Sequence, residues 1–170
     1  MIRLIQHTDA DRIWELVNTN RVYLKKWLPW LDWNTSIKDT RKFITESLKS
    51  YADNNSMVCV IMDDDEIHGV CSFYSLDKSI KAGFIGYWIA ETSQGKGLVT
   101  KACRELENIG FNRLGLNKIE IHAAKENTSS RKVAERLGYL ETGTILDAEW
   151  LYDHYVNHVI YCKRRKSKDF

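Results

Sequence analysis

The sequence predicts an α+β (α/β) fold in which helices flank a mixed, mostly antiparallel central sheet. The first observation is the order of hydrophobic periods along the chain, which reads β-α-α-β-β-β-α-β-α-β-β. The second is that a helix separates two of the strands, as parallel pairing requires, whereas short turns join three earlier strands into an antiparallel meander. The third is the length of 170 residues, which suits one domain, so we expect a single domain over residues 1–170.

The composition is that of an ordinary globular protein, with 44% hydrophobic and 28% charged residues. A net charge of +2 is too small to indicate nucleic acid as the main partner. No apolar run approaches the roughly 20 residues of a membrane helix and no apolar signal core is present, so we expect a cytoplasmic protein without a membrane partner. The four cysteines lack C-x-x-C spacing and are expected to be buried free thiols. His154 and His158 lack the glutamate of H-E-x-x-H, so no metal site is expected.

The chain is predicted to begin with a strand and a helix. Residues 2–5 alternate between polar and apolar side chains, which is typical of a strand with one buried face. Thr8 and Asp9 can then cap a helix over residues 10–18, whose apolar residues form one stripe.

A segment rich in tryptophan follows at residues 23–33, and it also holds the one proline of the chain. Large aromatic side chains are costly to leave exposed and often line pockets or interfaces. Two interpretations therefore stay open: the tryptophans line a substrate pocket, or they cover one end of the core. The residues concerned are Trp27, Trp30 and Trp33.

The next segment is predicted to be a capped helix followed by the meander. Ser36 with Asp39 resembles a capping box, and a 3.6-residue apolar period then continues to about residue 52. Three β-like runs follow, separated by short polar turns. They cover residues 58–62, 67–74 and 79–90.

A glycine-rich crossing between a strand and a helix is the strongest binding signal in the sequence. Gly95 and Gly97 leave backbone amides free at a helix N-terminus, where they can hold an anion, and Lys96 adds positive charge. Thr100 stands where a dinucleotide fingerprint needs its third glycine, and the lysine lies in the wrong place for a P-loop. The sequence predicts a site for a phosphate-bearing ligand; a plain strand-to-helix turn is the alternative. The helix should reach about residue 114.

The last third of the chain is predicted to contain a strand, a helix and a final antiparallel pair. Residues 119–123 alternate as a half-buried strand, and a helix opens at Asn127 and stops at Gly138. Further strand-like residues begin at position 139 and cover 149–162. The basic residues 163–168 are expected to form a solvated, frayed terminus.

Taken together, these motifs resemble the GNAT N-acetyltransferases, and within them the Rim-type branch, whose members acetylate the N-terminal amine of ribosomal proteins. The superfamily motif is usually written Q/R-x-x-G-x-G/A, and Thr92 departs from its first position. The resemblance covers nearly the whole chain. It rests on Gln94-Gly95-Lys96-Gly97, Asn127-x-x-Ser130, Glu135-Arg136-Leu137-Gly138-Tyr139, Trp27-Leu28-Pro29-Trp30, Ile85-Gly86-Tyr87-Trp88, and Ala148-Glu149-Trp150 followed by Tyr152-Asp153.

The resemblance implies acetyl-coenzyme A as the cofactor. Its pyrophosphate would lie on the amides of residues 94–98, and its pantetheine arm would run between the strand of Tyr87 and the strand of residues 119–121. The tryptophan segment would border the acceptor. The cofactor-binding residues that the resemblance implies are Tyr87, Trp88, Ile89, Gln94, Gly95, Lys96, Gly97, Leu98, Val99, Asn127 and Ser130.

The reaction implied is attack of a neutral amine on a thioester. Many members of the superfamily protonate the departing thiolate with a tyrosine, but the matching residue here is Ala134, so Ser130 is the implied acid. The alternative is that Ser130 only caps its helix. The oxyanion would meet the backbone amide of Ile89. An ordered water is the preferred proton route, with His122 and Glu46 as alternative bases.

Three functions stay open at this point. An α-amine has a pKa of about 7.7–8.0 and needs little help to lose its proton, which favours a protein N-terminus as acceptor. The second function uses a small amine such as a polyamine, an antibiotic or an amino acid, and the third is a non-catalytic acyl-coenzyme A-binding module. Aromatic residues near Trp30 and Trp150, together with the resemblance, suggest a homodimer.

Overall fold

The computed structural model describes residues 1–165, and at its centre is a seven-stranded sheet with the order β1-β2-β3-β4-β5-β7-β6. The β4–β5 pair is parallel and its neighbours are antiparallel, so the predicted mixed sheet with flanking helices is confirmed. The strands are β1 (Ile2–Leu4), β2 (Met57–Asp63), β3 (Glu66–Asp77), β4 (Ala82–Ile89), β5 (Lys118–Ala124), β6 (Leu140–Leu151) and β7 (His154–Arg164).

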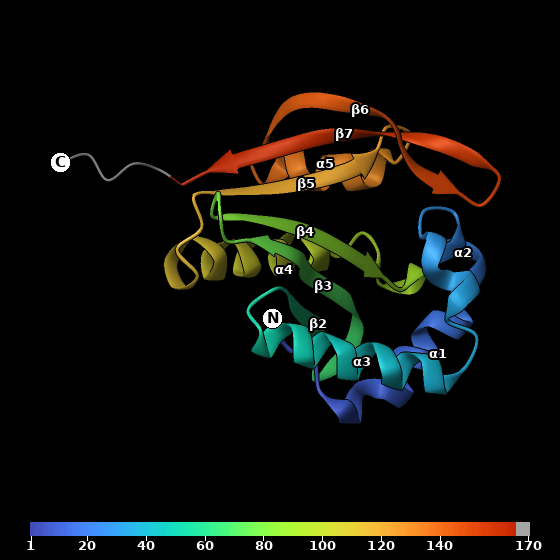
Figure 1. Cartoon of the computed structure of the whole chain (residues 1–170). Helices are drawn as coiled ribbons and strands as arrows, with labels where there is room; N and C mark the ends of the chain where they lie inside the picture. Colours follow the sequence, from blue (N-terminus) through green and yellow to red (C-terminus); the bar gives the residue numbers. More distant parts are fainter. Residues whose placement is uncertain (166–170) are drawn as a thin grey trace.

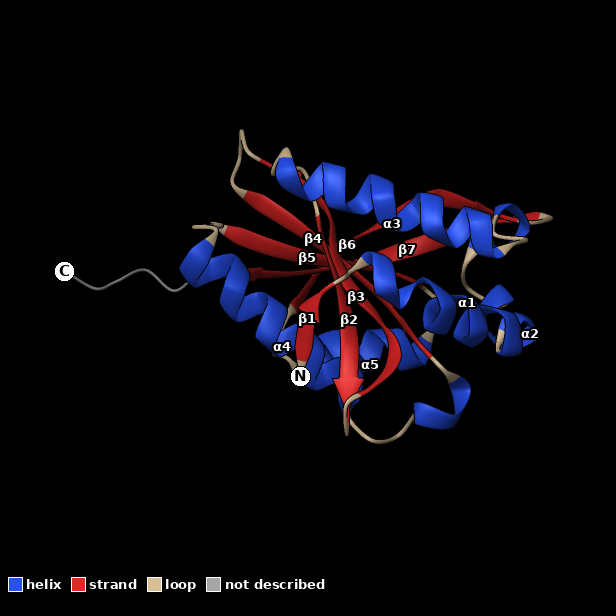
Figure 2. Ribbon diagram, turned by 90° about the horizontal axis from the view of Figure 1, so that it is seen from below, coloured by secondary structure: helices blue, strands red, loops and turns tan. Residues whose placement is uncertain are grey.

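Helices cover both faces of the sheet, with α3 on one side and α4 and α5 on the other (Figures 1 and 2). Each side has its own cluster of buried apolar residues, one involving α1, α2 and α3 and the other α4 and α5. The main helices are α1 (Ala10–Thr19), α2 (Arg21–Lys25), α3 (Ile37–Ala52), α4 (Leu98–Asn108) and α5 (Thr128–Arg136). Short 3₁₀ turns add η1 (His7–Asp9), η2 (Pro29–Trp33) and η3 (Glu91–Ser93).

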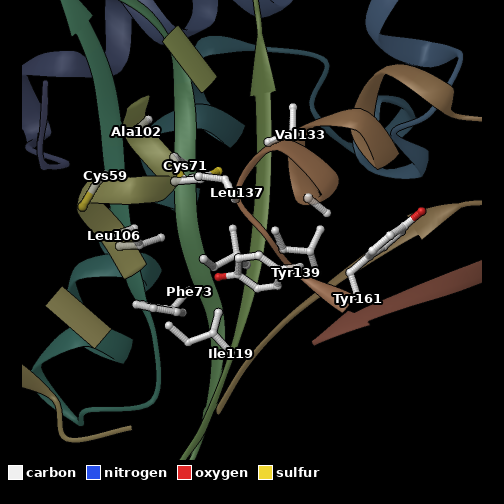
Figure 3. Packing of buried hydrophobic residues seen from close by; sticks show 14 of the residues in the cluster. Cys59, Cys71, Phe73, Ala102, Leu106, Ile119, Val133, Leu137, Tyr139 and Tyr161 are labelled. Carbon is white, nitrogen blue, oxygen red and sulfur yellow. Dashed lines mark hydrogen bonds between the residues drawn. The ribbon is translucent and has the colours of Figure 1, made fainter. Parts of the chain in front are cut away.

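A cluster of buried apolar residues packs α4 and α5 against the sheet. This cluster contains Ala102 and Leu106 of α4, Val133 of α5 and Phe73 of β3 (Figure 3). All four are buried. The predicted free thiols belong to this region: Cys59, Cys71 and Cys103 are buried and unpaired by disulfides, whereas Cys162 is half-buried.

The predicted start of the first helix is correct, but the predicted cap is not. Asp9 occupies the N-cap position of α1 without a capping hydrogen bond to its amides. Its carboxylate instead accepts hydrogen bonds from the Arg3 guanidinium at 2.7 and 2.8 Å and from the Gln6 amide at 2.8 Å. The capping box of Ser36 and Asp39 at the start of α3 is confirmed.

Two other boundaries differ from the sequence prediction. β4 begins at Ala82 and not at residue 79, because the Asp77 carboxylate accepts hydrogen bonds from the Ser79 and Ile80 amides and closes a turn. α4 ends at Asn108 and continues as a π-helical turn, η4 (Ile109–Arg113). Here the backbone of Gly110 packs so closely that a Cβ would lie 2.8 Å from the Phe73 ring. The prediction of a frayed basic terminus over residues 163–168 is wrong for Lys163 and Arg164, which belong to β7. Residues 166–168 lie outside the described residues.

Candidate active site

The parallel strands β4 and β5 separate halfway along their length. They pair only from Ala82–Ile85 to Lys118–Ile121, after which the end of β5 pairs with β7 alone. Figure 1 shows the two strands side by side at their starts and diverging toward α2. The second half of β4, residues 86–89, therefore pairs only with β3, and an opening forms in the middle of the sheet.

A cavity of about 880 Å³ occupies this opening. That volume falls within the range of about 300–1,000 Å³ typical of small-molecule sites. Elements far apart in the sequence meet at its walls, and the structure brings together the following predicted site residues: Tyr87, Trp88, Asn127, Ser130, Trp27, Trp30 and Trp33.

Ser130 lies in the first turn of α5, where it contacts Tyr87. The Tyr87 hydroxyl lies 3.0 Å from both the backbone carbonyl and the Oγ of Ser130. Asn127 caps α5 by accepting a hydrogen bond from the Ser130 amide at 3.1 Å. Asn127 therefore occupies the capping position of α5, and the Ser130 hydroxyl faces Tyr87.

The protonation state of Tyr87 limits the hydrogen bonds that this contact can form. Burial raises the pKa of the Tyr87 phenol, so the hydroxyl stays protonated at neutral pH. When its single proton is donated to the Ser130 carbonyl, the Ser130 hydroxyl can donate to the phenol oxygen in turn. Ala134 lies one turn further along α5 and is fully buried.

The glycine loop has the geometry that an anion site needs. Gly95 and Gly97 both have φ of +74°, a backbone conformation that residues other than glycine adopt only with strain. A Cβ at either position would meet no other atom within 4 Å, so the space in front of the backbone is open. Gly97 is the N-cap of α4, whose first amides face this space.

The other predicted loop residues contribute mainly through the backbone. Leu98 and Val99 pack their side chains against the core beneath α4, and Ile89 is buried in the same cluster. Lys96 is exposed. The Gln94 side chain donates a hydrogen bond to the Tyr23 hydroxyl. None of the residues 89 and 94–99 lines the cavity, so the loop forms a separate part of the site beyond the end of β4.

The tryptophans satisfy both interpretations that the sequence left open. Trp30 packs against Trp88 with ring centroids 6.4 Å apart and joins the core cluster around α1 and α3. Trp27 and Trp33 also line the cavity, and Trp33 is 78% exposed. This segment thus covers the core with one face and borders the cavity with the other.

Two histidine–glutamate pairs lie on strands β5, β6 and β7. His122 Nε2 is 2.9 Å from Glu120, whose other oxygen accepts from Lys118 Nζ at 2.5 Å. Burial raises the pKa of Glu120, but its hydrogen bonds to Lys118 and His122 outweigh this and lower the pKa below its usual value. Glu120 is therefore a weak base.

The second pair was missed by sequence reasoning. His158 Nε2 lies 3.5 Å from Glu149 Oε2, and both side chains line the cavity together with His122. Glu149 carries no other ion pair among the described residues. Its only signal in the sequence was the Ala148-Glu149-Trp150 motif, because nothing in the pattern shows that β6 and β7 return to the cavity. Glu46, an alternative base predicted from sequence, also lines the cavity, from α3.

Residues 1–165 contain no group of three or more histidine, cysteine, aspartate or glutamate side chains placed to hold a metal ion. Within the same residues, every helix is too short or too polar to cross a membrane.

Comparison with known proteins identifies the family. Residues 1–140 match the family model described as an acetyltransferase (GNAT) domain. The chain belongs to the GNAT acetyltransferase family. The predicted enzyme class and the acetyl-coenzyme A donor of that family are therefore confirmed.

Relatives within the GNAT family cover nearly the whole chain. YdaF of Bacillus subtilis (strain 168) is 39% identical over 159 residues, which are 92% of this chain and 85% of YdaF. The ribosomal-protein-serine acetyltransferase of Escherichia coli (strain K12) is 28% identical over 95% of this chain and 90% of its own length. The solved structure of RimL, a ribosomal L7/L12 alpha-N-protein acetyltransferase in complex with coenzyme A, has a TM-score of 0.93 at 26% identity. That alignment covers 96% of this chain and 92% of RimL.

Proposed function

We propose that this enzyme transfers the acetyl group of acetyl-coenzyme A to the N-terminal α-amine of a ribosomal protein, in a direct attack with both substrates bound. The observation that carries the proposal is the cavity between β4 and β5, where Ser130 and the tryptophan segment border the same space. Relatives named for acetylation of ribosomal proteins support the choice of acceptor.

The residues of the chain fit the proposed donor. The open space in front of Gly95 and Gly97 suits the pyrophosphate, because amide hydrogens and a helix N-terminus there stabilise negative charge. The unpaired side of β4 after Ile85 suits an extended arm that pairs like a strand. Asn127 borders the arm from the α5 side. We propose that the cofactor is bound by the full set expected from the sequence, which is Gly95, Gly97, Asn127, Tyr87, Trp88, Ile89, Gln94, Lys96, Leu98, Val99 and Ser130.

Bound acetyl-coenzyme A supplies the thioester whose carbonyl carbon the amine attacks, with release of the coenzyme A thiol. In this scheme the Ser130 hydroxyl turns from the Tyr87 oxygen, 3.0 Å away, to the departing sulfur and donates its proton there, and a water returns a proton to the serine oxygen. The amide of Ile89 stabilises the developing oxyanion. The aromatic walls limit the access of water.

The amine proton needs an acceptor on the opposite side of the cavity. Glu149 suits this role better than Glu120, which is held by both Lys118 and His122 and does not line the cavity. His158 lies next to Glu149 and can orient its carboxylate. We therefore propose Glu149 as the group that takes the proton, directly or through a water.

Two further proposals concern the setting of the enzyme. Ribosomal proteins are made in the cytoplasm, and we place the enzyme there.

Trp150 is 52% exposed and stacks edge to face with Tyr155, with ring centroids 4.8 Å apart. This exposed aromatic pair on the β6–β7 hairpin is our candidate contact for a homodimer, which light scattering after gel filtration would test.

The acceptor is tested by measuring thiol release from acetyl-coenzyme A over a panel. The panel contains short peptides with the N-terminal sequences of ribosomal proteins, the same peptides with a blocked N-terminus, and small amines such as polyamines and amino acids. We expect turnover with the free N-termini only. Turnover confined to the small amines would overturn the proposed acceptor, and coenzyme A binding without release on any member would indicate a non-catalytic module.

A further inference from the structure

The short helix α2 lies between the two halves of the site and contacts both. On its N-terminal side, the Asn20 side chain accepts a hydrogen bond from the Glu91 amide at 2.8 Å. One turn later, the Tyr23 hydroxyl accepts a hydrogen bond from the Gln94 side chain. Glu91 is the first residue of η3 and Gln94 is its C-cap, so α2 holds the segment that leads into the glycine loop (Figure 1).

Arg21 connects the same helix to the tryptophan wall. Its guanidinium donates hydrogen bonds to the carbonyl of Leu31 at 2.9 Å and to the carbonyl of Asn34 at 2.7 Å. Leu31 is fully buried within η2, which also carries Trp30 and Trp33. Two bonds from one planar group fix the direction of this turn more firmly than a single bond would.

The contacts of α2 have no other evident purpose in the site. Asn20, Arg21 and Tyr23 do not line the cavity between β4 and β5; Asn20 and Tyr23 line a separate hollow of about 200 Å³ together with Glu91. The Asn20 amide group also donates to the Leu16 carbonyl at 2.8 Å, which fixes its orientation at the junction of α1 and α2. Hydrogen bonds thus join the segment before the glycine loop to α2, and α2 to the turn that carries the tryptophans.

We propose that α2 is a positioning element that couples the two binding events, with Asn20 and Tyr23 on the cofactor side and Arg21 on the acceptor side. Occupation of the loop then favours the wall geometry that binds the acceptor. By linkage, acceptor-side contacts strengthen cofactor binding by the same factor. The inference rests on the proposed function for the identity of the two ligands.

The test measures the affinity for each ligand in a variant whose substitution lies on the side of α2 that contacts the other ligand's part of the site. Arg21→Ala should weaken coenzyme A binding about five-fold by calorimetry, although Arg21 touches no part of the loop. Tyr23→Phe removes one hydroxyl and should raise KM for a short peptide with a free N-terminal serine about five-fold at saturating acetyl-coenzyme A. Coenzyme A affinity is also measured for Tyr23→Phe and for the double variant, and the double variant should lose less affinity than the product of the two single losses, because both substitutions act through one helix.

Two matched variants serve as controls. Val22→Ala changes a residue of α2 that is 93% exposed, and Arg41→Ala removes an exposed arginine of α3 whose single ion pair within residues 1–165 is with Asp11. Both should bind coenzyme A and peptide as the wild type does. Thermal melts confirm that all variants are folded; Tyr23→Phe keeps the ring and serves if Arg21→Ala does not fold.

The coupling is overturned if Arg21→Ala raises only the peptide KM and Tyr23→Phe raises only the coenzyme A dissociation constant. In that case the wild type still binds and turns over, and the proposed function stands. A wild type that does not bind coenzyme A would overturn the proposed function and the coupling together.

Discussion

The cofactor side and the acceptor side of this site are built in different ways. On the cofactor side, two glycines with φ of +74° and the first turn of α4 present backbone groups. On the acceptor side, side chains from η2, α3, β5, β6 and β7 form the walls of one cavity. A backbone site depends on local geometry over a few residues, whereas a side-chain cavity depends on how distant elements pack.

The largest effect on ligand binding is expected from a substitution in the glycine loop. Gly97→Val forces a β-branched residue into a left-handed conformation and fills the open space in front of the loop. We expect acetyl-coenzyme A binding to weaken by at least about 100-fold, or about 2.7 kcal/mol. Calorimetry with coenzyme A measures the change.

Gly115→Val is the matched control, because Gly115 also has a positive φ of 66° and also has no atom near its Cβ position. It should lose a similar amount of stability but keep coenzyme A affinity. Equal losses of binding in both variants would show that strain and not the ligand space causes the effect.

The next largest effect is expected on kcat, from a substitution of Ser130. Ser130→Ala should lower kcat about 100-fold through loss of the proton donor, with coenzyme A affinity nearly unchanged. Tyr87→Phe should lower kcat less, since Ser130 keeps its hydroxyl but loses the bond that orients it. Steady-state kinetics and calorimetry separate the two quantities, and Ser129→Ala on the exposed side of α5 is the control. Unchanged turnover in Ser130→Ala would remove it as the acid.

A smaller effect is expected on the acceptor side. Glu149→Gln should lower kcat about ten-fold, because an α-amine with a pKa of about 7.7–8.0 loses its proton readily even without a strong base. Glu46→Gln changes the other candidate carboxylate of the cavity and should retain wild-type turnover. Rates measured over a range of pH would reveal the loss. A defect in Glu46→Gln alone would reassign the base, and a defect in neither would favour water as the proton route.

The smallest effect on activity is expected outside both halves, at the Arg3–Asp9 pair. Burial raises the pKa of Asp9, but its bonds to Arg3 and to the Gln6 amide outweigh this and hold the pKa below its usual value of about 3.9. The stability that this pair adds is present above pH ~4 and is lost as the pH falls through the folded-state pKa. Arg3→Ala should lower the free energy of unfolding by about 1–3 kcal/mol at neutral pH.

Urea titrations at several pH values test this expectation. The variant should also show a weaker loss of stability in acid, while its coenzyme A affinity at neutral pH stays that of the wild type. A variant with the same acid dependence as the wild type would show that Asp9 is not stabilised by Arg3.

The same contrast explains what the sequence could predict. The turn at the glycines, the start of α3 and the order of the longer helices and strands along the chain follow from local patterns, and the structure agrees with them. The short helix α2 was not predicted. The π-helical turn at Gly110 was missed because it depends on the Phe73 ring, which is distant in sequence. The Tyr87–Ser130 contact joins β4 to α5, and Glu149 enters the cavity only because β6 folds back beside β7. Periodicity carries no information about such long-range contacts.

The most direct test of the account is a crystal structure of the enzyme with coenzyme A. We predict that the pyrophosphate contacts the amides of residues 94–98, that the arm lies along the open side of β4, and that the thiol ends beside Ser130 Oγ. Coenzyme A bound away from the loop, or with its thiol outside the cavity between β4 and β5, would contradict the account.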